Sequence, residues 1–98
     1  MKKTVAILGL SATMALAHTP LMSCFDNMDG TITCEAGFSD GSSASGVEFK
    51  IEQNGKVVFE EKFDNFSEVT FDQPDDEYTA IMDAGEGHRV RMSSKDIF

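Results

Sequence analysis

Apolar and polar residues alternate along most of the chain after Met22, and this period of two is the feature that most narrows the possible folds. Successive side chains of a β-strand point to opposite faces, so a half-buried sheet shows this alternation. No stretch beyond residue 17 has a convincing helical period. The predicted strands are Thr31–Phe38, Val47–Gln53, Lys56–Phe63, Glu68–Asp72, Glu77–Asp83 and Arg89–Met92, with a further strand around Cys24. We therefore predict an all-β fold, a small antiparallel β-sandwich of six or seven strands.

Two alternatives remain open within this pattern. In the segment 77–83, the pattern does not decide whether Tyr78 or Ile81 faces the core, because apolar residues occupy both phases. Asn54-Gly55 suggests a two-residue hairpin turn, but that turn would set Ile51 opposite Val58 and mismatch the apolar faces. We therefore predict a three-residue loop, 53–55, with Gly55 left-handed in a bulge. This register pairs Ile51 with Val57 and Phe49 with Phe59.

The two cysteines are predicted to form a disulfide. A three-residue loop at 28–30 sets Cys24 opposite Cys34 across a hairpin. An exported chain enters an oxidising compartment, where two cysteines normally pair. A two-cysteine metal site is the alternative.

Residues 1–17 have the organisation of a secretory signal peptide. Lys2 and Lys3 form a positive start, and the apolar run that follows ends in A-L-A at 15–17, a signal-peptidase motif. The run is too short to span a bilayer comfortably, and no second apolar stretch follows, so we expect no stable membrane insertion after cleavage. The sequence predicts a signal peptide at 1–17, one β-sandwich domain at 18–98, and a periplasmic location.

Lipidation is the competing interpretation of this region. Leu21-Met22-Ser23-Cys24 looks like a lipobox, which would attach lipid to Cys24. His18-Thr19-Pro20 interrupts the apolar region just upstream, and lipidation would leave Cys34 without a partner. We therefore favour cleavage after Ala17.

The net charge of the chain limits the classes of partner that it is expected to bind. The formal net charge is −9, and removal of Lys2 and Lys3 takes it to −11. Nucleic acids and anionic membrane surfaces attract basic proteins, so the charge argues against both. It is compatible with cationic partners or metal ions, and also with plain solubility in the periplasm.

The two histidines are the candidate metal ligands. Cleavage after Ala17 would give His18 a free α-amine beside its imidazole, and such a pair can chelate a metal. His88 lies in a glycine-rich loop, where Glu86 or Asp83 could add an oxygen ligand. Imidazole nitrogens suit copper, nickel, cobalt and zinc, and an α-amine loses its proton near neutral pH. Copper(II) should bind most tightly in vitro whichever metal is physiological.

Other motifs predict less. The segment 29–33 resembles the middle of an EF-hand loop, but Phe25 and Ala36 would stand where that loop needs acidic ligands. The methionines are better explained as core residues than as copper(I) ligands. No nucleophile motif surrounds any serine, so we expect no enzymatic activity and no organic cofactor.

An ordered series of short motifs resembles a known family. It consists of G-F-S-D-G at 37–41, N-G-K at 54–56, Tyr78-Thr79, and D-A-G-E-G-H at 83–88. Over about residues 31–92, the chain resembles small periplasmic β-sandwich proteins associated with nickel and cobalt uptake, which are similar to the transthyretin or carboxypeptidase-regulatory sandwich. The resemblance implies an accessory role in metal handling, with a membrane transporter component as partner. By position it carries over His88 and the F-S-D-G turn.

We therefore expect a periplasmic protein that binds nickel, cobalt or copper and delivers it to a transporter. The alternative is a non-catalytic module that binds another periplasmic protein and has no physiological metal.

Overall fold

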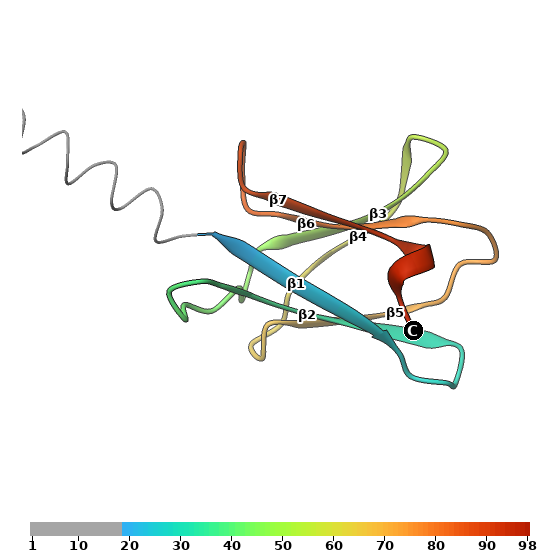
Figure 1. The fold of residues 1–98 in the computed structure, drawn as a ribbon, viewed down its shortest axis with the longest axis horizontal. Coiled ribbons are helices and arrows are strands. Elements are labelled where there is room, and N and C mark those ends of the chain that lie inside the picture. The colour runs from blue at the N-terminus through green and yellow to red at the C-terminus, as the bar shows by residue number, and fades with distance from the viewer. Residues whose placement is uncertain (1–18) are drawn as a thin grey trace, which may run out of the picture.

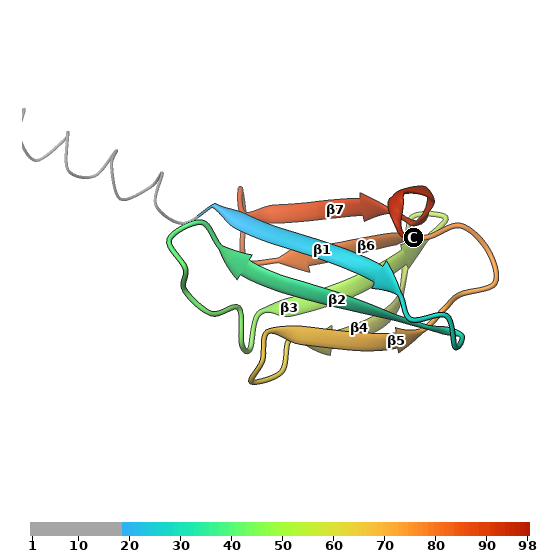
Figure 2. The ribbon, with the colours of Figure 1, turned by 60° about the horizontal axis from the view of Figure 1, so that its bottom comes forward.

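The computed structural model describes residues 19–98, which form two stacked antiparallel sheets (Figures 1 and 2). The three-stranded sheet has the order β1-β2-β5 and the four-stranded sheet the order β4-β3-β6-β7. The elements are β1 Pro20–Asp26, β2 Thr31–Phe38, β3 Glu48–Gln53, β4 Lys56–Lys62, β5 Glu68–Asp72, β6 Thr79–Asp83, β7 Arg89–Ser93 and a short 3₁₀ helix, η1 Ser94–Asp96. The predicted β-sandwich of seven strands is confirmed, whereas the predicted signal peptide and His18 lie outside the described residues.

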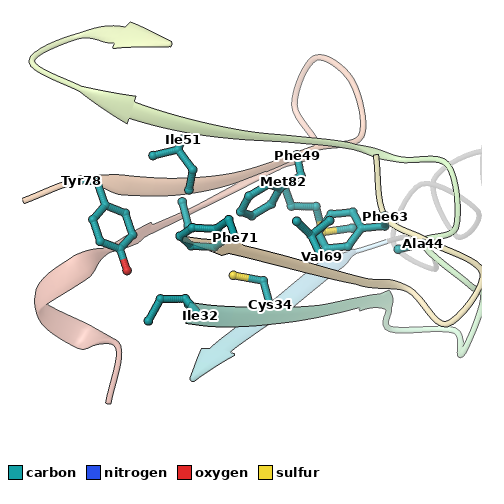
Figure 3. Packing of buried hydrophobic residues seen from close by; sticks show 11 residues of the cluster. Ile32, Cys34, Ala44, Phe49, Ile51, Phe63, Val69, Phe71, Tyr78 and Met82 are labelled. Carbon is teal, nitrogen blue, oxygen red and sulfur yellow. The ribbon is translucent and has the colours of Figure 1, made fainter. Parts of the chain in front are cut away.

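The core lies between the two sheets and is rich in aromatic rings (Figure 3). Phe49 of β3 is fully buried, and its ring lies 5.5 Å, centroid to centroid, from both Phe63 and Phe71. The ring of Phe71 in turn meets Tyr78 edge-on at 5.8 Å. Such ring pairs add stabilisation to the large apolar area that they bury. The apolar side chains on the inward-facing sides of the strands therefore form one continuous core.

Strand β6 shows which residues of the segment 77–83 face the core, a question that the sequence pattern left open. Tyr78, just before the strand, and Ala80 and Met82 within it belong to the core between the sheets. Ile81 is also buried, but it points to the outer face, where Lys50 and Arg91 are its cross-strand neighbours. Long basic side chains can cover apolar surface with their methylene stems. A strand covered on both faces shows no clear alternation, which explains the ambiguity.

The β3–β4 hairpin corrects our predicted register. Gln53 pairs with Lys56, so Asn54-Gly55 is a two-residue turn, and both residues have positive φ, 52° and 77°. The predicted three-residue loop is wrong, because Asn tolerates the left-handed region that a type I′ turn requires. A bulge lies one step further along, where Val58 is the extra residue. The resulting pairs are Glu52 with Val57, Ile51 with Phe59 and Phe49 with Glu61.

The β1–β2 hairpin agrees with the prediction. Cys24 lies opposite Cys34 and the two form a disulfide, with their Cα atoms 4.0 Å apart. The backbone N–H of Asn27 donates to the carbonyl of Thr31 at 3.0 Å, which closes the predicted loop at 28–30. A link across a loop this short is expected to stabilise the fold by about 2–3 kcal/mol.

The start of β1 and the β6–β7 turn lie side by side at one end of the sandwich (Figures 1 and 2). The loop 39–47 between β2 and β3 comes to the same end. Three segments far apart in the sequence therefore meet there. No helix within residues 19–98 is long and apolar enough to cross a membrane.

Candidate functional site

A hollow of about 580 Å³ opens at this end of the sandwich, between the β2–β3 loop and the β6–β7 turn. Apolar side chains from both segments contribute to its walls, and His88 is the only imidazole among its lining residues. The lining consists of Phe38, Ser42, Gly46, Val47, Glu48, Asp83, Ala84, Gly85 and His88. The hollow is larger than four others in the described part of the chain, whose volumes are about 220 to 420 Å³. It therefore offers a bound group more room than any of these four.

The β6–β7 turn that carries His88 has a defined backbone. Gly85 and Gly87 have φ of 114° and 78°, a region that glycine enters without steric cost. The N–H of His88 donates to the carbonyl of Gly85 at 2.9 Å, and the N–H of Ala84 donates to the carbonyl of His88 at 3.0 Å. The two glycines therefore fold the predicted loop into a tight turn that holds the backbone of His88.

The imidazole of His88 is half-buried and oriented by this same turn. Its Nδ1 lies 3.1 Å from the carbonyl oxygen of Glu86. A carbonyl can only accept, so Nδ1 is the donor, and in the neutral ring Nε2 keeps its lone pair. Metal-binding histidines commonly have this arrangement, with one ring nitrogen held by a backbone carbonyl or carboxylate and the other free for the metal.

The carboxylate of Asp83 is already paired with cationic side chains of the protein. Its Oδ1 lies 3.1 Å from Arg89 Nε and accepts the N–H of Gly85 at 3.0 Å, while Oδ2 lies 3.4 Å from Lys50 Nζ. The hydrogen bond from Gly85 and the neighbouring Arg89 and Lys50 hold the pKa of Asp83 below its ordinary value. A metal bound by this carboxylate would have to compete with both cations.

The remaining predicted ligands are less constrained. The residue Glu86 is exposed at the tip of the turn, and its backbone carbonyl is the acceptor for His88. Within residues 19–98, no three side chains of His, Cys, Asp or Glu come close enough to form a metal site by themselves. Cys24 and Cys34 form their disulfide, so they are not thiolate ligands. This part of the chain therefore offers His88 as its one oriented nitrogen ligand.

The chain enters this end of the molecule beside the hollow. His18 lies outside the described residues, but Thr19 is anchored by two hydrogen bonds to Ser39. The N–H of Thr19 donates to Ser39 Oγ at 3.2 Å, and the N–H of Ser39 donates to the carbonyl of Thr19 at 2.9 Å. Ser39 directly follows Phe38, which lines the hollow together with His88. Thr19 is thus hydrogen-bonded to the residue that follows Phe38, one of the residues that line the hollow.

The sequence did not predict the apolar wall of the hollow or the hydrogen bonds that anchor Thr19 to Ser39. Phe38 and Val47 fit the alternation of two different strands, so nothing local marks them as neighbours of His88. The F-S-D-G turn, which stood out through the resemblance, was the one available indication. It contains both Phe38 and Ser39.

Comparisons with family models, with curated proteins and with solved structures found no match for this chain. A β-sandwich supports many functions, so the fold alone does not select one. An assignment therefore rests on the chemistry of the residues around the hollow.

Proposed function

We propose that the exported protein binds a divalent transition metal, nickel, cobalt or copper, at the end of the sandwich that carries His88. The ligands are Nε2 of His88 and, after cleavage behind Ala17, the α-amine and imidazole of His18. The observation that carries the proposal is the orientation of His88, whose Nδ1 is held by the carbonyl of Glu86. That contact leaves Nε2 as a neutral nitrogen donor, which these metals prefer.

The anchoring of Thr19 supports the same site. Consecutive Cα atoms are about 3.8 Å apart, so the residue before Thr19 starts close to the Ser39 contact. Three nitrogen ligands from two residues would leave coordination positions open. Glu86 is a candidate for an oxygen ligand, because its side chain is exposed in the same turn. An incomplete and accessible ligand set suits a protein that passes its metal to a periplasmic transporter component.

Metal titration tests the α-amine directly. Copper(II), nickel(II) and cobalt(II) are titrated into protein that starts at His18 and into protein with one extra glycine before it. We expect the extra residue to weaken copper binding at least about tenfold, because it turns the amine ligand into an amide. A residue added after Phe98 is the matched control and should leave the affinity unchanged. Equal affinities for the three proteins would remove the α-amine from the site.

The variant His88→Ala tests the second ligand. We expect it to weaken copper binding and to remove one nitrogen from the copper electron paramagnetic resonance spectrum. The variant Asp83→Asn should leave that spectrum unchanged, because the Asp83 carboxylate is paired with Arg89 and Lys50. A spectrum unaltered in His88→Ala would place the metal elsewhere.

A second candidate function is a protein-binding module without a physiological metal. The observation that favours it is the number of exposed apolar side chains away from the hollow, including Val57, Val58 and Phe66. Exposed apolar groups often mark interaction surfaces. The titration above separates the two functions, since a module would bind none of the three metals tightly even with His18 as its first residue.

A further inference from the structure

The two sheets have four edge strands, and three of them carry features that oppose pairing with another strand. Edge strand β4 has the bulge at Val58, and it has Glu61 opposite the buried Phe49 on the inner face. Edge strand β7 presents Arg89 and Arg91 to solvent. Edge strand β5 has only five residues and is acidic at both ends. Bulges, inward charges, exposed basic side chains and short length are common devices against edge-to-edge association.

Between Leu21 and Phe25, strand β1 has none of these devices. They are confined to its ends, where Pro20 begins the strand and the charged Asp26 ends it on the same face as Met22 and Cys24. Its seven residues pair with β2 in one unbroken register, and the segment 20–25 contains no charged side chain. On its outer face, Leu21 is 53% exposed and Phe25 is 39% exposed, with Ser23 between them. This stretch is the uncharged edge of a strongly acidic chain.

The backbone of β1 also has open hydrogen-bonding groups. Just beyond the strand on either side, Thr19 and Asn27 bond to the β2 side, so the odd-numbered residues between them face β2. The even-numbered residues face the free edge, and there the N–H of Asp26 already donates to the carbonyl of Phe98 at 3.0 Å. Pro20 has no N–H to donate. Among the described residues, no backbone group pairs with Met22 or Cys24 on this edge.

We propose that β1 pairs antiparallel with β1 of a second copy of this chain, about a two-fold axis at Ser23. In this register Met22 lies opposite Cys24 of the second copy, and the two residues exchange both backbone hydrogen bonds. The two-fold axis generates the same exchange between Cys24 of the first copy and Met22 of the second. The interface therefore has four backbone hydrogen bonds. The three-stranded sheets then continue into one six-stranded sheet with the order β5-β2-β1-β1-β2-β5.

The side chains and strand ends agree with a self-pairing. The register sets Leu21 opposite Phe25 of the second copy, so each exposed apolar side chain covers the other. The pairing is confined to residues 21–25, because Phe98 already occupies the free edge beside Asp26 and Pro20 has no N–H to donate, so the ladder ends at the same point on both sides. A two-fold interface requires such self-complementarity. Two acidic chains repel each other, and an uncharged edge brings the fewest carboxylates together.

Sedimentation equilibrium of the processed protein tests the proposal. The concentration is varied from about 1 μM to about 1 mM in the presence of a chelator, so that metal bridging plays no part. We expect a monomer–dimer equilibrium with a dissociation constant in roughly the micromolar range, as is usual for a small interface. In the variant Ser23→Lys, two lysines meet at the axis, and we expect dimerisation to weaken at least about tenfold.

The variant Val58→Lys is the matched control, because it adds the same charge at an exposed position of a different edge. It should dimerise like the unaltered protein.

Amide exchange in the unaltered protein gives a readout that needs no variant: the N–H groups of Met22 and Cys24 should become more protected as concentration rises. A protein that stays monomeric, or a dimer that Val58→Lys disrupts and Ser23→Lys does not, would overturn the assignment to β1. Metal binding is independent of either result.

Discussion

At the scale of single residues, Asp83 and His88 have different roles although they lie five positions apart. The carboxylate of Asp83 joins β6 to β7 and β3 through Arg89 and Lys50 and also fixes the turn through Gly85. Within residues 19–98, the hydrogen-bond partner of the His88 imidazole is the carbonyl of Glu86, in the same turn. We therefore assign Asp83 mainly to stability, and His88 stays the proposed metal ligand.

The role of Asp83 predicts a pH dependence. Its folded pKa is lowered, so its contribution to the free energy of unfolding is complete above the ordinary value of 3.8 and is lost as the pH falls through the folded pKa. We expect Asp83→Asn to lower stability by about 1 kcal/mol at pH 7, because the ion pairs lie near the surface. Urea unfolding at pH 7 and at lower pH should show this difference shrinking as the pH falls. Glu86→Gln, in the same turn, is the control, and an equal loss in both variants would contradict the role of Asp83.

At the scale of elements, the alternation predicted the strands well, and the turn chemistry decided how they pair. Six predicted strands match observed strands within two residues, and the predicted hairpin around Cys24 supplies the seventh. The β3–β4 register failed because the apolar match was given more weight than the Asn54-Gly55 turn. The structure keeps the two-residue turn and places the bulge at Val58, after the turn and not within it. Ile51 then pairs with the apolar Phe59, whereas Phe49 comes opposite Glu61.

This turn predicts the effect of replacing Gly55. Its φ of 77° is strained for any residue with a Cβ, although an added Cβ would meet nothing within 4 Å. We expect Gly55→Ala to lower stability by about 1 kcal/mol or more, purely through the backbone. Gly37→Ala is the control, because Gly37 has no positive φ and its added Cβ would meet the Ser42 carbonyl at an ordinary 3.8 Å. Thermal melts that rank the two variants the other way would contradict this account of the turn.

At the scale of the whole molecule, a small core holds the two sheets together. Phe49 is fully buried and its ring contacts rings from β4, β5 and the segment after β4. Truncation there removes contacts to both sheets at once, and the cavity is too enclosed to collapse fully.

We therefore expect Phe49→Ala to lower the free energy of unfolding by about 3–5 kcal/mol, enough to unfold many domains of this size. Phe66→Ala removes the same atoms at a site that is 83% exposed, and it should change stability by no more than about 0.5 kcal/mol. Denaturant unfolding of the two variants checks the difference. Similar losses in both would mean that the ring cluster does not hold the sheets together.

The sequence by itself determined the β-sandwich class, most strand positions and the Cys24–Cys34 pair, because these depend on local periodicity and on the length of one short turn. Only the tertiary structure decided the register of β3 with β4, the burial of both faces of β6, and the neighbours of His88. Those features depend on which strands stack and where loops distant in the sequence meet. The pairing of Asp83 with Lys50 is of this kind, because it joins residues from two strands far apart in the sequence.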